Sequence, residues 1–248
     1  MTTPTIVLLH GVGLDHTVWA TVRTQLPGYH VVAPDLLGHG TSAAAPDGTT
    51  LADIAETVLR RIDTPDRDEA GVHLVGFSLG ALVAQYIACF RPDLAATVTC
   101  VSSVYRRTPE QRSAVLGRLA TAQQDFGATV TASIARWFDG TDVPAEQVAR
   151  VRAVLESNDP RSFVNCYRVF ATADAEIGAE IPRISAPMLA ITGEHDPGST
   201  PEMTRRLAHD VPGGRHTIVP GARHMLPVEQ PGVLAGQLTA FLGEHTDV

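Results

Sequence analysis

One serine stands between two glycines in the stretch Gly76-Phe77-Ser78-Leu79-Gly80, which follows a strand-like apolar run and opens a helical pattern. A sharp strand-to-helix turn strains the residue at its apex, and glycines two positions before and after it avoid collisions between Cβ atoms. Such a turn lifts the serine hydroxyl above the sheet edge. The pattern predicts that Ser78 is a nucleophile, although an ordinary strand-to-helix turn can carry the same residues.

A serine hydroxyl needs a base to become nucleophilic, and the base needs a carboxylate that fixes its tautomer. Asp196 and His224 each follow a later apolar run, so the chain order is Ser, Asp, His and all three belong to one sheet edge. Glu194 competes for the role of the acid, and His195 competes for the role of the base. We favour Asp196 because the Pro-Gly-Ser-Thr-Pro that follows it turns the loop. We favour His224 because His195 lies beside the candidate acid.

The glycine-rich stretch His10-Gly11-Val12-Gly13 follows the first strand-like run. Glycines let the backbone approach a substrate oxygen, and the Leu79 N–H lies at a helix N-terminus, where the dipole favours negative charge. We expect the N–H groups of Val12 and Leu79 to form an oxyanion hole. His10 and His39 are expected to fasten loops rather than to react.

Six apolar, β-rich runs alternate with helical patterns along the chain. Runs that are apolar on both faces suit buried parallel strands, so the sequence predicts an α/β fold with a mostly parallel central sheet. The predicted strands are residues 5–10, 30–34, 72–77, 97–103, 187–193 and 215–220, and the helices between them are residues 16–26, 51–62, 79–90, 201–208 and 231–243.

One long interval between the fourth and fifth strands contains only helical patterns, at residues 109–126, 129–138, 144–157 and 161–173. It leaves the sheet at the carboxyl ends of the strands, where ligands bind in open α/β sheets. We therefore predict a core of residues 1–103 and 187–248 and an inserted helical lid of residues 104–186.

Several large or charged side chains are candidates for the substrate pocket beneath this lid. They are Trp137, Phe138, Arg136, Tyr167 and Met225, with Phe170 as a further aromatic residue. At helical spacing, such aromatic residues also suit the core of the lid itself. Arg136, with Arg106 and Arg107, could bind a substrate carboxylate, and the adjacent pair could equally form a solvated positive cluster.

Composition excludes several classes of protein. The formal net charge is −8 and the basic residues are scattered, so nucleic acid is not an expected partner. The first ten residues have no basic region, and the apolar run at 6–9 is too short for a signal peptide or a membrane span, which predicts a cytoplasmic protein. Cys89, Cys100 and Cys166 have wide spacings, and the ten histidines show no paired motif, so neither disulfides nor a metal site is expected.

The motifs HGVG, PDLLGHGTS, GFSLG, GEHD and GARHMLPVEQP occur in this order, and with them the chain resembles the α/β-hydrolase superfamily. It looks closest to 3-oxoadipate enol-lactonase-like and carboxylesterase-type serine hydrolases. SVYRRTPEQR (103–112) and Arg136-Trp137-Phe138 are similar to the cap of that branch. The resemblance implies an α/β-hydrolase fold and cofactor-independent hydrolysis of a small ester or lactone through an acyl-enzyme on Ser78.

The chain departs from this family at its beginning. Family members usually have two strands before the oxyanion loop, and this sequence has no runs that correspond to them. The strand at 30–34 should then lie at a sheet edge, where it could pair with a second copy in a homodimer.

Two other functions remain open from the sequence. The same catalytic residues serve carbon–carbon bond hydrolases that cleave vinylogous diketones, and a ligand-sensing receptor could retain them without turnover. Epoxide hydrolases and dehalogenases are disfavoured because they need a carboxylate where this chain has Ser78.

Overall fold

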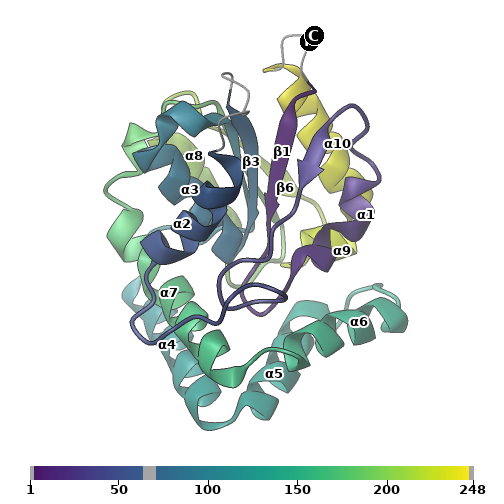
Figure 1. The fold of residues 1–248 in the computed structure, drawn as a ribbon. Helices are drawn as coiled ribbons and strands as arrows, with labels where there is room; N and C mark the ends of the chain where they lie inside the picture. Colours follow the sequence, from purple (N-terminus) through teal and green to yellow (C-terminus); the bar gives the residue numbers. More distant parts are fainter. Residues whose placement is uncertain (1–2, 64–70, 246–248) are drawn as a thin grey trace.

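A single six-stranded sheet forms the centre of the protein, as seen in the computed structural model, which describes residues 3–63 and 71–245 (Figure 1). Its strands are β1 (Thr5–Leu9), β2 (His30–Val32), β3 (Val72–Phe77), β4 (Ala95–Val101), β5 (Met188–Gly193) and β6 (Arg215–Val219). Their order in the sheet is β2-β1-β3-β4-β5-β6, and every neighbouring pair is parallel. The predicted α/β class with a mostly parallel sheet of about six strands is confirmed.

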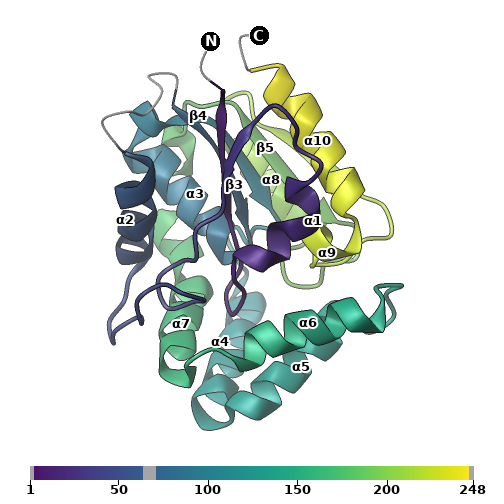
Figure 2. The same ribbon diagram turned by 45° about the vertical axis from the view of Figure 1, so that its right-hand side comes forward.

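Helices cover both faces of this sheet, which explains why strands β3 and β5 are buried along their whole length. One face is covered by α2 (Leu51–Ile62), α3 (Leu79–Phe90) and α8 (Pro201–Asp210), and the other by α1 (Ala20–Arg23) and α10 (Pro231–Gly243) (Figure 2). Strand β2 lies at one edge of the sheet, as the sequence predicted, and β6 lies at the other.

Side-chain caps fix where several helices begin. Thr50 accepts a hydrogen bond from the Asp53 N–H at 3.2 Å, while the Asp53 carboxylate accepts one from the Thr50 N–H at 2.9 Å. Thr108 and Gln111 form the same reciprocal box at the start of the first inserted helix. These boxes satisfy N–H groups that have no partner within the helix, so the sequence determines each start locally.

The helix predicted at residues 16–26 is wrong in its extent. The structure has a 3-10 turn, η1 (His16–Trp19), followed by only four α-helical residues in α1. The carboxylate of Asp35 accepts hydrogen bonds from both the backbone N–H and the ring Nδ1 of His16, at 2.9 and 2.8 Å, and so ties the start of this segment to a distant loop. β-branched residues along the segment also lower its helix propensity.

Between β4 and β5 the chain forms four helices and a short 3-10 turn. They are α4 (Pro109–Gln124), α5 (Phe126–Phe138), α6 (Ala145–Glu156), α7 (Pro160–Ile177) and η3 (Ile181–Arg183). Helix α7 packs against α3 of the core, while α5 and α6 lie side by side beyond the end of the sheet (Figures 1 and 2). Strands β4 and β5 are parallel neighbours, with Val98 opposite Met188 and Val101 opposite Ile191. The helical insertion therefore leaves the sheet at the carboxyl end of one strand and rejoins it at the amino end of the next.

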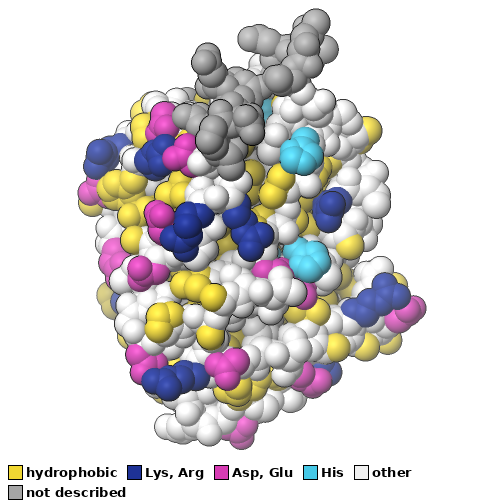
Figure 3. Space-filling view, in the orientation of Figure 1, with side chains coloured by type: hydrophobic (Ala, Val, Ile, Leu, Met, Phe, Trp, Pro, Cys, Tyr) yellow, Lys and Arg dark blue, Asp and Glu magenta, His cyan; other side chains and the backbone are white. Residues whose placement is uncertain are grey.

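The face seen in Figure 3 carries Arg side chains dispersed among Asp and Glu, without a continuous basic stripe. All 19 positively charged residues of the chain are arginines. Within the described ranges, no helix combines the length and the apolar character that crossing a bilayer requires.

Candidate active site

Ser78 occupies the turn between β3 and α3 in a strained backbone conformation, with φ of 55° and ψ of −111°. Its N–H donates to the Val101 carbonyl oxygen of β4 at 2.9 Å, which holds the turn against the sheet. A Cβ atom at Gly76 would overlap the Gly80 carbonyl group, and one at Gly80 would overlap the Leu9 carbonyl group. Both glycines are therefore required by close backbone contacts around the serine.

Asp196 and His224 form a buried hydrogen bond, with 2.7 Å between His224 Nδ1 and Asp196 Oδ2. The side chains of His224 and Asp196 are 11% and 0% exposed. The other carboxylate oxygen of Asp196 accepts hydrogen bonds from the Gly198 and Ser199 N–H groups, each at 2.9 Å. Because Asp196 accepts from Nδ1–H, the His224 Nε2 atom has a free lone pair that can take a proton.

The two competing residues lie elsewhere. Glu194 is 52% exposed and accepts a hydrogen bond from the Gly221 N–H at 3.0 Å. His195 is 62% exposed and its nearest carboxylate is that of Glu194, at 3.8 Å. The geometry therefore favours Asp196 and His224 over their neighbours in sequence.

A second carboxylate, that of Glu229, holds the backbone on both sides of His224. It ends the short helix α9 (Leu226–Glu229) and accepts hydrogen bonds from the Arg223 N–H at 2.8 Å and the Met225 N–H at 2.7 Å. Burial raises the pKa of Glu229 above its usual value, while the two N–H donors and nearby His224 oppose the rise. The Ser102 hydroxyl adds a third restraint, since it donates to the His224 carbonyl oxygen at 3.1 Å.

Two buried histidines fasten the loop that follows β1. The Gly13 N–H donates to His39 Nε2 and the Leu36 N–H donates to His10 Nε2, each at 2.9 Å. Both imidazoles must be neutral to accept these bonds. Burial lowers the pKa of His10 to about 4 and that of His39 to about 3. The loop-fastening role expected for these residues agrees with this geometry.

One pocket brings the core residues together. Ser78, Asp196 and His224 all line it, and so does Val12 from the loop after β1. Leu79 opens α3, so its N–H is among those that lack a partner within the helix. The pocket therefore joins a serine, a hydrogen-bonded His–Asp pair and a glycine-rich backbone segment, which is the set of groups that acyl transfer requires.

The helical insertion supplies the opposite wall of this pocket. Trp137, Arg136 and Tyr167, all predicted from the sequence, line it together with Phe170 and the unpredicted Arg118. The Trp137 ring is stacked toward the His224 ring, with centroids 6.4 Å apart and an interplanar angle of 21°.

Two predicted pocket residues do not line the pocket. Phe138 follows Trp137 on α5, and successive helical residues point about 100° apart, so Phe138 packs into the core instead. Met225 is fully buried in the core beside its turn. Arg106 is also absent from the pocket lining, because its guanidinium pairs with Asp210 of α8 at 2.9 Å.

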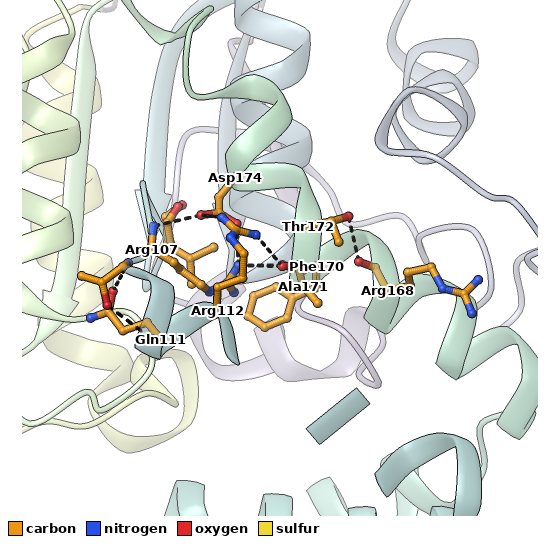
Figure 4. A network of polar contacts seen from close by, with 11 residues as sticks. Arg107, Gln111, Arg112, Arg168, Phe170, Ala171, Thr172 and Asp174 are labelled. Carbon is orange, nitrogen blue, oxygen red and sulfur yellow. Dashed lines mark hydrogen bonds and ion pairs between the residues drawn. The ribbon is translucent and has the colours of Figure 1, made fainter. Parts of the chain in front are cut away.

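Arg107 lines the pocket but is already paired with a carboxylate (Figure 4). Its Nη1 donates to Asp174 Oδ1 at 2.6 Å, and Arg112 Nη2 donates to the other oxygen of Asp174 at 2.9 Å. The guanidinium also lies over the Phe170 ring, 4.8 Å from its centroid. Arg107 Nη2 is buried and has no hydrogen-bond partner among the described groups.

Arg118 and Glu229 are the site residues that sequence reasoning missed. Arg118 lies on a helix whose polar residues gave no sign of which face meets the pocket. Glu229 belongs to the stretch GARHMLPVEQP, and its spacing of five residues from His224 was the available signal. A four-residue helix that begins next to a proline offers too little periodicity to be recognised.

Comparison with known proteins agrees with this architecture. A model of the alpha/beta hydrolase family matches residues 6–237. The (E)-2-((N-methylformamido)methylene)succinate hydrolase of Acinetobacter baylyi is 30% identical over 238 residues, which cover 96% of this chain and 89% of that protein. The 3-oxoadipate enol-lactonase 1 of the same organism is 26% identical, over 92% of this chain and 84% of that protein.

Among solved structures, the enol-lactonase from Burkholderia xenovorans superimposes with a TM-score of 0.85 and 26% sequence identity. The match covers 98% of this chain and 92% of that one. The likeness therefore extends over both the sheet and the helical insertion.

Proposed function

The chain belongs to the alpha/beta hydrolase family, and we propose that within it the protein is a cofactor-independent serine hydrolase of a small ester or lactone. Ser78 is the nucleophile, His224 the base and Asp196 the acid that orients the base. The observation that carries the proposal is the pocket that Ser78 shares with the hydrogen-bonded pair His224 and Asp196.

In the first half of the reaction, His224 Nε2 removes the hydroxyl proton of Ser78 while Oγ attacks the substrate carbonyl carbon. The carbonyl oxygen becomes an oxyanion and is stabilised by the N–H groups of Val12 and Leu79. His224 then transfers its proton to the leaving oxygen, the carbon–oxygen bond breaks, and the acyl group remains on Ser78. Asp196 stabilises the imidazolium throughout.

In the second half, water takes the place of the leaving alcohol. His224 accepts a proton from the water, and the resulting hydroxide attacks the acyl carbon. Collapse of the second oxyanion breaks the bond to Ser78 Oγ, which regains its proton from His224 and releases the acid. For a lactone, the alcohol and the acid are two ends of one product.

The helical insertion supports this assignment as a lid, because its side chains form the wall opposite Ser78. Arg136, Trp137 and Tyr167 are the predicted residues that contact substrate there. The relative named 3-oxoadipate enol-lactonase 1 also supports the proposal. An enol-lactone is a cyclic ester, so its hydrolysis follows the mechanism described above.

Labelling with a fluorophosphonate tests the nucleophile directly. We expect one adduct by intact mass, mapped to Ser78, in the wild type and in Ser113→Ala, an exposed serine of α4. Ser78→Ala should show no adduct and should lose more than about 10³-fold in kcat on aryl esters. Wild-type activity in Ser78→Ala would disprove the assignment.

Carbon–carbon bond hydrolysis is the second candidate. The 30% identical relative is named as a hydrolase of an amide-bearing methylene succinate rather than of a lactone, so the relatives are not limited to ester bonds. Model substrates distinguish the two functions. If the protein turns over a coloured vinylogous diketone but does not hydrolyse esters, the carbon–carbon reaction is favoured. Binding of either compound without turnover indicates ligand sensing instead.

A further inference from the structure

The pocket wall formed by the insertion is strongly positive, although the whole chain has a net charge of −8. Three guanidinium groups line this pocket, those of Arg107, Arg118 and Arg136. Of these three, only Arg107 forms an ion pair, with the carboxylate of Asp174. The same carboxylate also pairs with Arg112. Among the described residues, no carboxylate forms an ion pair with Arg118 or Arg136, and the carboxylate of Asp196 in the same pocket is paired with His224.

Arg118 is held in place by a neutral partner. Its Nε donates to the Tyr167 hydroxyl oxygen at 3.1 Å, across the gap between α4 and α7. Both residues line the pocket. A bond through Nε fixes the plane of the guanidinium and leaves its two terminal nitrogens to bind another acceptor, which suits two-pronged recognition of a carboxylate.

Arg136 is held in a similar way from the next helix. Its Nη2 donates to the Ser133 hydroxyl at 3.1 Å, one turn earlier on α5, and its guanidinium lies 5.9 Å from the Trp137 ring centroid. Burial lowers the pKa of Arg136, and the positive charge of Arg118 acts in the same direction, while Tyr167 and Asp196 oppose the change. Two like charges close together in a partly buried pocket are unfavourable unless an anion binds between them.

We propose that Arg118 and Arg136 form a clamp for a free carboxylate of the substrate. The inference rests on the proposed hydrolase function and narrows its substrate class to anionic esters or lactones. When the free carboxylate is on the acyl part, hydrolysis at Ser78 yields a dicarboxylic acid. Arg107 is buried and paired with Asp174, so it is not part of the clamp.

Matched aryl esters test the clamp. One pair consists of 4-nitrophenyl hydrogen glutarate and its neutral methyl ester, with the carboxylate on the acyl part. A second pair has the carboxylate, or its methyl ester, on the phenol. The wild type should prefer the acidic member of at least one pair in kcat/KM, and Arg118→Gln or Arg136→Gln should reduce that preference roughly tenfold to a hundredfold.

Arg168→Gln is the matched control, because Arg168 lies on α7 with an exposed side chain outside the pocket (Figure 4). It should keep the wild-type preference. Tyr167→Phe should lose part of it, since the ring remains while the hydroxyl that orients Arg118 is removed. If the wild type and both arginine variants have the same kcat/KM for acidic and neutral esters, the clamp is wrong. The proposed serine hydrolase function would still stand.

Failure of the hydrolase proposal is distinguishable from failure of the clamp. If no ester is turned over and Ser78 forms no fluorophosphonate adduct, titration calorimetry with glutarate tests binding alone. Weaker glutarate binding in the double variant Arg118→Gln/Arg136→Gln than in Arg168→Gln supports the clamp. Equal binding in these two proteins overturns it.

Discussion

At the scale of single residues, the carboxylate of Asp196 is fully buried and is saturated with donors from its own loop and from His224. This environment fixes the orientation of the carboxylate. A carboxylate in this position can only accept, so it selects the His224 tautomer with hydrogen on Nδ1. The proposed base depends on that tautomer.

Asp196→Asn is therefore expected to keep the shape of the site and to lower kcat by about 10⁴, because the amide can donate to Nδ1 and stabilise the wrong tautomer. Glu194→Gln, on the same loop, should have little effect. Steady-state kinetics on one aryl ester measures both. A loss in Glu194→Gln as large as in Asp196→Asn would refute our choice of the acid.

Glu229 leads to a prediction about the rate of the reaction. Glu229→Gln removes a negative charge near His224 that stabilises the imidazolium formed during catalysis, so kcat should fall. The glutamine oxygen can still accept from one of the two N–H groups beside His224. Steady-state kinetics of the wild type and the variant on one aryl ester measures the change, and an unchanged kcat would argue that Glu229 acts only on the backbone.

Single residues were predictable from the sequence where chain order and local geometry constrain them. Ser78 needs a turn between two glycines, and Asp196 and His224 each follow a strand, so one-dimensional information was enough to select them. Arg118 could not be found in this way, because only the packing of α4 against α7 decides which way it points. The prediction that Phe138 lines the pocket was wrong, because the sequence did not show that Trp137, its neighbour on α5, faces the pocket instead.

At the scale of elements, the loop after β1 depends on two neutral histidines. Unfolded histidines have a pKa of 6.5, whereas His10 and His39 in the fold have pKa values of about 4 and about 3. Below pH 6.5 the unfolded chain binds protons that the folded chain excludes. Stability is therefore fully present above about pH 6.5 and is lost progressively as the pH falls toward 4.

Urea unfolding at pH 7, 6 and 5 should show this decline, at roughly 1 kcal/mol per pH unit for each histidine. His39→Gln removes one titrating group and keeps an acceptor for the Gly13 N–H, so its stability should fall less steeply over the same range. If the wild type and the variant have the same pH dependence, His39 does not titrate as the fold implies.

Asp174 joins α7 to the segment that leads from β4 into α4. Asp174→Asn would leave the buried guanidinium of Arg107 without its counter-charge, which should cost about 3–5 kcal/mol of unfolding free energy. Asp47→Asn breaks a pair with Arg161 that is exposed on both sides, and no measurable change in the urea midpoint is expected. A wild-type midpoint in Asp174→Asn would show that Arg107 finds other partners.

The elements themselves were largely predictable. The helices at 51–62, 79–90 and 231–243 were predicted with the bounds that the structure has, because caps, prolines and apolar periodicity mark their ends. The helical segment predicted at 16–26 begins at His16 as predicted, but its first turn is a 3-10 turn tied to Asp35, far along the chain, and its α-helical part ends at Arg23. Local patterns describe local structure, and long-range hydrogen bonds override them.

At the scale of the whole molecule, function is divided between two parts that the sheet connects. The parallel strands and their loops supply Ser78, Asp196 and His224, which suit acyl transfer in general. The helical insertion supplies Arg118, Arg136 and Trp137, which suit a particular substrate. Chain order and turn geometry predicted the first set. Residue type and position in the insertion predicted Arg136 and Trp137, whereas Arg118 depends on how the helices pack against one another.

The adjacency of β4 and β5 has an evolutionary consequence. The segment that we propose to determine the substrate joins two neighbouring strands, so helices can be added, removed or exchanged there without changing the register of any strand. Under the proposed function, selection can change the insertion while Ser78, Asp196 and His224 stay the same. A protein engineer could use the same junction to graft the helices of a related enzyme and transfer its substrate preference.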